Sequence, residues 1–204
     1  DDTFNFTCSE LNALGGLDGG LGTDTINLSG GGTALAAALT SIENLIIADD
    51  DDYTITVDST NIGLNTIDLS NLSSGAHAAI LDTTGYNDDL NITTGLGDDQ
   101  IDTGDGDNTI TIGSGLYSIH TGAGDDTFTV DLHTFNVNSV IDGGGGDNTL
   151  FVVNSSTFNS VPAGLSHVQT LAVDNNDYTI TLGNSDISAI DGSRVYTHAL
   201  SIDV

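Results

Sequence analysis

The sequence predicts an all-β fold, a parallel β-solenoid of the β-roll or β-helix kind. Three observations support this prediction: a nine-residue repeat over residues 94–129, a second repeat with a period of 124 residues, and a composition rich in Gly and Asp. Fixed periods of this kind are typical of chains that stack one supersecondary unit on the next. Both repeats also place acidic residues in turns, so they bear on function.

The nine-residue repeat divides residues 94–129 into the nonapeptides TGLGDDQID, TGDGDNTIT, IGSGLYSIH and TGAGDDTFT. Gly at the second and fourth positions allows the positive φ of a tight turn over the first six residues. The last three residues then form a short strand whose middle side chain faces inward. The inward residues, expected to stack in a core, are Ile101, Ile110, Ile119 and Phe128.

Two nonapeptides are expected to close one coil, so that residues 18 apart lie on neighbouring coils about 4.8 Å apart. The sixth-position residues Asp99 and Tyr117 then share one side of the solenoid, and Asn108 and Asp126 share the other. This arrangement brings carboxylates and turn carbonyls together, and six to eight oxygens at about 2.3–2.6 Å are what calcium requires. We expect calcium mainly on the Asn108 and Asp126 side and a defective or empty site beside Tyr117.

The nonapeptide block resembles the calcium-binding β-roll of the RTX (repeats-in-toxin) family, with the pattern G-G-x-G-x-D-x-U-x. In that family the sixth-position Asp and the turn carbonyls hold calcium between stacked turns. The resemblance implies ligand roles for Asp99 and Asp126, and a weaker one for Asn108. Neighbouring carboxylates are expected to help on the second side; they are Asp105, Asp107 and Asp125.

Three further segments are candidate metal turns. GGLGTD (19–24) and GGGGDN (143–148) keep the glycines, and the expected ligands there are Asp24, Asp147 and Asn148. Asp89, in a degenerate turn before the block, is expected to complete a site with the Asp107 and Asn108 turn. The alternative for each is a plain Gly-Asp turn without an ion. The run 49–52 (DDDD) has no glycine and is interpreted as a solvated charge run.

Charge narrows the function classes. The 204 residues include one basic residue, Arg194, and 30 acidic ones, giving a formal net charge of −29. A compact chain with that charge repels itself unless cations neutralise it, which implies bound divalent metal independently of the motif. The charge argues against nucleic acid and anionic membrane surfaces as partners, and no apolar run is long enough for membrane insertion. Disorder or a halophilic surface is the alternative, but strand-like segments recur throughout.

The longer repeat defines the expected organisation. DDTF at 1–4 matches 125–128, and LDGG at 17–20 matches IDGG at 141–144, both at a distance of 124 residues. Residues 1–18 are therefore interpreted as the end of one unit, 19–142 as a full unit and 143–204 as a partial second unit. We expect a longer tandem array, whose coils would cover apolar residues near the ends such as Phe4, Phe6 and Ile202.

Outside the block we expect irregular solenoid coils. Alternating apolar residues between Gly, Asn, Asp and Ser turns predict strands at 26–28, 45–48, 53–57, 66–69, 79–81 and 90–93. The alanine-rich stretch 33–39 (TALAAAL) favours one short helical turn.

A second resemblance concerns the stretches SIENL and TIDLS, which are similar to segments of bacterial surface-layer proteins and other large secreted RTX proteins. It implies an extracellular location at the bacterial cell surface, secretion by the type I route, and self-association into a layer or filament. We therefore expect a calcium-binding structural repeat of a surface layer, filament or adhesin, with calcium driving folding and end-to-end assembly. The alternative is a calcium-triggered folding or secretion module of a secreted enzyme or toxin.

Catalysis is not expected. The chain has no Lys, one Arg and no G-x-S-x-G nucleophile elbow. No two of its five histidines have metal-ligand spacing, and Cys8, which aligns with Leu132, is expected to be a buried apolar residue. An ice-binding solenoid is a further alternative because T-x-T pairs occur at 54–56, 109–111, 127–129 and 179–181. These pairs are not expected to fall on consecutive coils.

Overall fold

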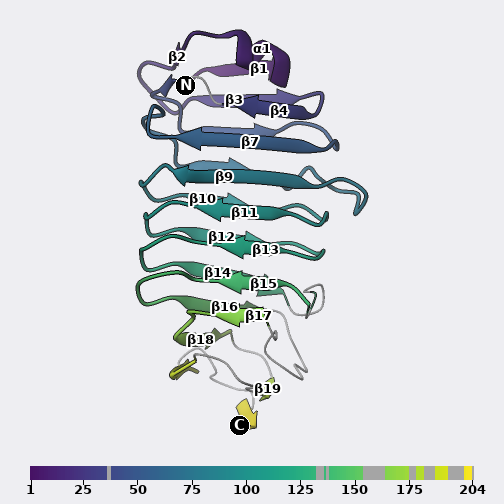
Figure 1. Cartoon of the computed structure of the whole chain (residues 1–204), viewed down its shortest axis with the longest axis vertical. Helices are drawn as coiled ribbons and strands as arrows, with labels where there is room; N and C mark the ends of the chain where they lie inside the picture. The colour runs from purple at the N-terminus through teal and green to yellow at the C-terminus, as the bar shows by residue number, and fades with distance from the viewer. Residues whose placement is uncertain are drawn as a thin grey trace.

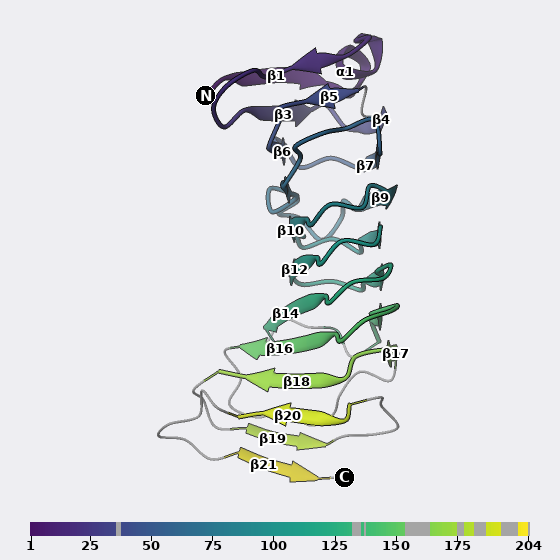
Figure 2. The same cartoon turned by 90° about the vertical axis from the view of Figure 1, so that its left-hand side faces the viewer.

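The computed structural model of the chain describes residues 1–35, 38–131, 136, 138–153, 164–174, 178–181, 187–192 and 200–203. Over these residues the chain is a parallel β-solenoid of about 7 turns, which confirms the predicted fold class. Figure 1 shows the strands stacked along one axis from the N-terminus towards β21 (Leu200–Asp203). In the side view of Figure 2 two sheets form opposite walls of the column.

One wall is a ten-stranded parallel sheet in the described part of the chain. Its strands in spatial order are β1 (Thr3–Thr7), β3 (Thr25–Ser29), β6 (Asn44–Ile47), β8 (Thr66–Asp68), β10 (Asn91–Thr93), β12 (Thr109–Ile112), β14 (Thr127–Asp131), β16 (Thr149–Val153), β18 (Thr170–Val173) and β20 (Ala189–Asp191). All strands outside the nonapeptide block that the sequence predicted between residues 26 and 93 are present in this sheet or the opposite one.

The opposite wall is a seven-stranded parallel sheet, again within the described ranges. Its strands are β4 (Gly32–Leu35), β7 (Tyr53–Asp58), β9 (Ala79–Gly85), β11 (Gln100–Thr103), β13 (Ser118–His120), β15 (Val140–Asp142) and β17 (Gly164–Ser166). Two short parallel pairs complete the description: β2 (Leu17–Asp18) with β5 (Leu39–Thr40), and β19 (Tyr178–Thr181) with β21.

The strand register confirms that two nonapeptides make one coil. Ile101 of β11 pairs with Ile119 of β13, and Ile110 of β12 pairs with Phe128 of β14. All four side chains are fully buried, as predicted, because the middle residue of each short strand faces the interior. Sixth-position turns that lead into the same sheet therefore lie on the same edge of the solenoid.

The register also repeats with the longer period. Phe4 pairs with Ile26, and 124 residues later Phe128 pairs with Leu150. The next coil follows the same rule, since Ile26 pairs with Leu45 and Leu150 with Leu171. The tandem repeat read from the sequence is thus a repeat of the three-dimensional arrangement as well.

A short helix covers the first coil. Helix α1 (Cys8–Ala13) begins with a capping box, in which the Thr7 hydroxyl accepts the Glu10 N–H and the Glu10 carboxylate accepts the Thr7 N–H. It buries Leu11 and Cys8 in the core, which confirms Cys8 as a buried residue. No helix in the described residues is long and apolar enough to cross a membrane.

Two expectations are wrong. The stretch 33–39 does not form a helical turn over its described residues: Gly32–Leu35 pairs with β7 as strand β4, so tertiary pairing overrides the helix propensity of alanine. The T-x-T pairs at 109–111 and 127–129 do fall on consecutive coils, because two nonapeptides close a coil and bring Thr109 beside Thr127 and Thr111 beside Thr129. The pair at 179–181 belongs to β19, outside both large sheets.

Some predicted features lie outside the described residues. They are the side chain of Ile202 and residues Leu132, His133, Arg194 and His198. At the other end, Phe4 and Phe6 are only partly buried against the core, and their parallel rings stack with centroids 6.4 Å apart.

Candidate metal-binding turns

Glycine sets how closely successive turns approach. A Cβ at Gly113 would lie 2.0 Å from the carbonyl oxygen of Gly95 on the preceding coil, and a Cβ at Gly115 would lie 2.1 Å from that of Gly97. The φ of Gly115 is +142°, in the region that favours glycine. The repeated glycines therefore let the backbone carbonyls of one turn lie directly against the next turn.

The sixth-position side chains form an inner ladder along the edge that leads into the ten-stranded sheet. Each accepts a hydrogen bond from the sixth-position N–H of the preceding coil. Leu90 donates to Asn108 Oδ1 at 3.1 Å, Asn108 to Asp126 Oδ1 at 2.8 Å, and Asp126 to Asn148 Oδ1 at 2.8 Å. The structure thus brings the predicted residues Asn108, Asp126 and Asn148 into one buried column.

The same ladder occurs 124 residues earlier. The Asp2 N–H donates to Asp24 Oδ1, and the Asp24 N–H donates to Glu43 Oε2 at 2.7 Å. Asp24, like Asn148, is completely buried. The turn at 19–24 is therefore built like the turn at 143–148, as the sequence comparison predicted.

The fifth-position carboxylates form an outer ladder that runs in the opposite sense. Asp107 donates its N–H to Asp89 Oδ1 at 2.8 Å, Asp125 to Asp107 Oδ1 at 2.7 Å, and Asp147 to Asp125 Oδ1 at 2.8 Å. Asp105, at the third position, accepts the Ala123 N–H at 3.0 Å. The side chains of the outer ladder and Asp105 are exposed, so these predicted ligands lie on the outer surface of the turns and not in the buried column.

Three buried carboxylates are incompletely paired. Asp24, Asp99 and Asp126 are 0%, 2% and 1% exposed. In each, Oδ1 accepts a backbone N–H from a neighbouring coil, while Oδ2 has no hydrogen-bond partner among the described residues. A buried carboxylate with a free oxygen is costly unless a cation or a proton compensates it.

The pKa values of two of these carboxyls are raised, which agrees with the cost of burying an incompletely paired carboxylate. Burial raises the pKa of Asp99 from its usual 3.8 to about 6, aided by the nearby charge of Asp98 and opposed by the N–H groups of Ala79 and Gly95. Burial also raises the pKa of Asp126, although the Thr121 hydroxyl and Asn108 lower it. Both carboxyls therefore favour an added positive charge, which a bound cation can supply in place of a proton.

Asparagine at the sixth position donates hydrogen bonds from its own side-chain amide to the oxygens of its turn. Asn108 Nδ2 donates to Gly106 O at 2.7 Å and to Thr103 Oγ1 at 3.2 Å. Asn148 Nδ2 donates to Gly143 O at 2.6 Å and to His167 O at 2.9 Å. In both turns the amide nitrogen points at the oxygens that a metal ion would bind.

On the edge that leads into the seven-stranded sheet, a tyrosine hydroxyl likewise donates to carbonyl oxygens of the turns. The Tyr117 hydroxyl lies 2.8 Å from both Gly95 O and Ser114 O, so its single proton is shared between these two carbonyl oxygens. Burial raises the pKa of Tyr117 to about 12, which keeps this proton in place. The sequence singled out this turn for its lack of an acidic group, and the structure places a hydroxyl donor inside it.

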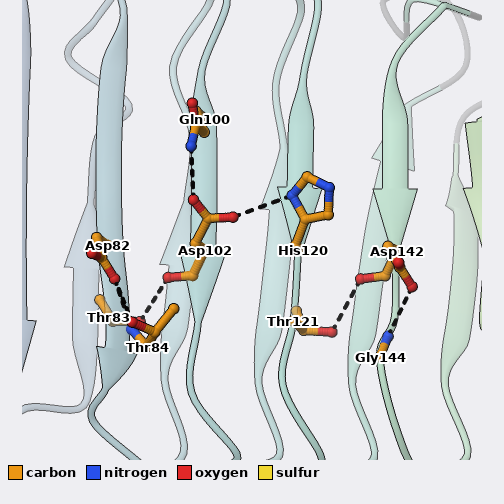
Figure 3. A network of polar contacts seen from close by, with 9 residues as sticks. All are labelled: Asp82, Thr83, Thr84, Gln100, Asp102, His120, Thr121, Asp142 and Gly144. Atoms are coloured by element: carbon orange, nitrogen blue, oxygen red, sulfur yellow. Dashed lines mark hydrogen bonds and ion pairs between the residues drawn. The ribbon is translucent and has the colours of Figure 1, made fainter.

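Histidine and aspartate pairs on the surface were not foreseen from the sequence. In Figure 3 the His120 imidazole points to Asp102 across neighbouring strands of the seven-stranded sheet. The pairs, measured from Nδ1 to Oδ1, are His77 and Asp52 at 3.4 Å, His120 and Asp102 at 3.2 Å, and His167 and Asp142 at 2.5 Å. The pKa of Asp142, which burial alone would raise, is held below its usual value by His167 and the Gly144 N–H. The spacing of 18 residues between Asp102 and His120 could have revealed that pair, whereas the other two pairs join coils of different length outside the block.

The acidic run 49–52 is more ordered than a solvated run. Asp49 accepts the Gly30 N–H at 2.8 Å and the Tyr53 hydroxyl. Asp52 accepts the Ala78 N–H at 3.0 Å. These carboxylates bridge coils, and although the run itself has no glycine, it packs against Gly30 and Gly31, where a Cβ at Gly31 would lie 3.0 Å from Asp51 Cβ.

The donor set of the sixth-position turns fits a hard cation. Within the described ranges no group of three or more His, Cys, Asp or Glu side chains is arranged to hold a metal ion. A cation in the turns of Asp24, Asp99 or Asp126 would therefore combine one buried carboxylate with backbone carbonyls and water. Calcium accepts such oxygen ligands in flexible geometry, whereas structural zinc sites are built from Cys and His.

No protein-family model, no curated protein and no solved structure matches this chain. The case for a cation in these turns therefore depends on the chain's own geometry.

Proposed function

We propose that this chain is a calcium-binding structural repeat segment of a long extracellular bacterial protein, such as a surface layer, filament or adhesin. The observation that carries the proposal is the set of three buried sixth-position carboxylates, Asp24, Asp99 and Asp126, each with an unpaired oxygen in a glycine-lined turn. The resemblance of the nonapeptide block to RTX repeats supports calcium as the ion, and the elongated tandem solenoid supports a structural role.

The free-energy cost of the buried carboxylates, compared with the usual stability of a domain, favours folding that depends on the ion. An uncompensated buried charge costs several kcal/mol even after relaxation, and a typical domain is stable by only about 5–15 kcal/mol. Asp24 lies 3.8 Å from the N-terminal ammonium group, and all three carboxylates accept one N–H, so their cost is offset only in part. Together with a net charge of −29 they reduce a stability of that size substantially. Calcium would neutralise the carboxylates and link the carbonyls of successive coils, so that binding free energy becomes folding free energy.

Far-UV circular dichroism of the chain in excess chelator and in millimolar calcium tests the proposal. We expect a largely unfolded or molten chain in chelator and a β-rich spectrum with calcium. Sodium chloride at matched ionic strength is the control, since screening alone should restore little structure. Equal β content in chelator and calcium would refute calcium-dependent folding.

A second candidate function, ice binding, is favoured by one observation. The first outward-facing position of the ten-stranded sheet is Thr or Asn on nine consecutive strands, namely Thr3, Thr25, Asn44, Thr66, Asn91, Thr109, Thr127, Thr149 and Thr170. Thermal hysteresis of the calcium-loaded chain measures this activity. A value no greater than that of a Thr109→Lys, Thr127→Lys variant removes the candidate.

A further inference from the structure

Asp24 and Asn148 form a matched pair inside one chain. They lie 124 residues apart, both are 0% exposed, and each accepts the N–H of the equivalent residue on the preceding coil. Each leads into a strand of the ten-stranded sheet, β3 for Asp24 and β16 for Asn148. At the sixth position the two side chains differ only in the last atom, although Leu21 and Thr23 of the first turn correspond to Gly145 and Asp147 of the second.

The glycine that opens each turn shows that the two atoms occupy the same place. A Cβ at Gly143 would lie 2.4 Å from His167 O and 2.7 Å from Asn148 Nδ2. A Cβ at Gly19 would lie 2.1 Å from Ser41 O and 2.8 Å from Asp24 Oδ2. The carboxylate oxygen of the first copy therefore replaces the amide nitrogen of the second.

The residues that supply the facing carbonyl share an unusual backbone conformation. Ser41 has φ +52° and His167 has φ +51°, and they are the two non-glycine residues with positive φ in the described part of the chain. Both copies thus keep a strained residue whose carbonyl oxygen faces the turn of the preceding coil. This common frame makes the difference between carboxylate and amide a controlled comparison.

The amide of Asn148 donates hydrogen bonds to the carbonyl oxygens around it, whereas the carboxylate of Asp24 cannot. Asn148 Nδ2 lies 2.6 Å from Gly143 O, 3.1 Å from Gly145 O and 2.9 Å from His167 O, all of which are acceptors. Its Oδ1 accepts an N–H, which fixes the orientation of the amide. Asp24 Oδ2 brings no proton to the corresponding oxygens and has no partner among the described residues.

The nonapeptide block repeats the contrast. Asn108 donates to the oxygens of its own turn, whereas Asp126, on the next coil of the same edge, has an unpaired Oδ2. On the other edge Tyr117 donates to Gly95 O and Ser114 O, and Asp99, one coil earlier, has an unpaired Oδ2.

We infer that the sixth residue decides which turns need a cation: the turns of Asp24, Asp99 and Asp126 require one, and the turns of Asn108, Tyr117 and Asn148 carry a side-chain donor in its place. The inference builds on the proposed function in taking the ion to be calcium. It revises the sequence interpretation of Asn108 as a weaker ligand and of Asn148 as a ligand. In the nonapeptide block each coil thus has one turn of each kind, Asp99 with Asn108 in one coil and Tyr117 with Asp126 in the next.

Reciprocal substitutions test the inference. Asp24→Asn should raise the thermal midpoint in chelator and bind one calcium fewer per chain, because the new amide supplies the missing donor. Asn148→Asp should lower the midpoint in chelator and bind one calcium more. Calcium stoichiometry is measured by equilibrium dialysis, and midpoints by circular dichroism in chelator and in calcium. Asp51→Asn and Asn5→Asp, at exposed positions, make the same charge changes outside the turns and should leave the ion count unchanged.

The two readouts separate this inference from the proposed function. A higher midpoint for Asp24→Asn in chelator, with no calcium bound by either protein, would support the donor role of asparagine and refute calcium binding. Calcium binding by the parent chain with no change in ion count for either variant would refute the inference and leave the proposed function standing. If Asn148→Asp is unfolded in calcium as well as in chelator, Asp24→Asn alone decides the donor role.

Discussion

The Tyr117 hydroxyl lies 2.8 Å from the carbonyl oxygen of Gly95, which is on the preceding coil of the solenoid. Gly95 opens the turn that ends at Asp99, so this carbonyl belongs to a turn whose carboxylate is incompletely paired. The tyrosine therefore occupies a carbonyl oxygen of the neighbouring turn. We therefore still predict, as from the sequence, that the edge that leads into the seven-stranded sheet binds metal less well than the other edge.

The first prediction compares Asp126→Ala with Tyr117→Phe. Asp126→Ala should lower the calcium stoichiometry, because it removes the carboxylate of its turn. Tyr117→Phe should leave the stoichiometry unchanged and lower stability by about 1–3 kcal/mol both in chelator and in calcium, since two buried carbonyls lose their donor. Calorimetric titration with calcium and urea denaturation measure the two effects. An equal ion count for both variants would show that the edges are wrongly assigned.

The second prediction concerns pH in the absence of calcium. The folded-state pKa of Asp99 is raised to about 6 from 3.8, so between these values the folded chain binds more protons than the unfolded one. The free energy of unfolding in chelator should therefore rise as the pH falls from 7 towards 4. Three carboxyls with lowered pKa values, Glu10, Asp58 and Asp142, oppose this gain, but only near the acid end of the range, where the unfolded groups with ordinary values of 4.5 and 3.8 take up protons.

Asp99→Asn is the matched control for the pH effect. It keeps the shape of the side chain and cannot titrate, so its gain in stability on acidification should be smaller than that of the parent. Urea midpoints at pH 5 and pH 7 in chelator are the measurement. Parallel pH profiles for the two proteins would show that general charge repulsion, and not this carboxyl, sets the dependence.

The third prediction tests the close approach of the turns with two glycines of similar conformation. Gly20 and Gly146 have φ of +85° and +87°, so alanine at either carries a similar backbone penalty of about 1–2 kcal/mol. A Cβ at Gly20 meets no atom within 4 Å, whereas one at Gly146 would lie 2.1 Å from Gly124 O. Gly146→Ala should therefore be the more destabilising by about 1–3 kcal/mol. Similar thermal midpoints in calcium would contradict the stacking argument.

The fourth prediction concerns assembly. Strand β1 is the outermost strand of the ten-stranded sheet and pairs on one side, with β3. An open strand edge is a template for another coil, but two chains of charge −29 repel each other. Calcium, which removes charge at its binding sites, should promote end-to-end association more than sodium chloride at the same ionic strength.

Sedimentation velocity in calcium, in chelator and in matched sodium chloride measures this association. We expect larger species in calcium alone, growing with protein concentration. A calcium-loaded chain that stays monomeric at high concentration would count against the structural array and favour the folding module of a secreted enzyme or toxin.

Much of the fold could be predicted because the middle residue of the three-residue strand in each nonapeptide is apolar and recurs at a fixed spacing. The inward position of Ile101 and Phe128, the pairing of residues 18 apart, and the shared edge of Asn108 and Asp126 all follow from two nonapeptides per coil. Helix α1 was also readable in principle, since TCSE is a capping box followed by Leu11. The alanine-rich stretch 33–39 was a misleading helix signal, because strand pairing with β7 determines its structure.

The candidate site was predictable in position but not in chemistry. Sequence spacing located Asp24, Asp99 and Asp126 in turns, yet it also counted Asp107 and Asp125, which are exposed, as helping ligands. Burial separates the two sets, and it depends on whether a side chain points into the coil or along its outer surface. The direction in which an Asn amide donates is likewise a property of the surrounding carbonyls, which no spacing rule reveals.

The 18-residue coil also has a mechanical consequence. Fully extended, those residues span about 60 Å, whereas a coil adds about 4.8 Å to the length of the column. A pulling force that peels one coil therefore releases more than ten times the length that the coil contributed. Under tension the solenoid would then lengthen in steps of one coil. The force needed for each step would depend on how the turns of that coil are held closed.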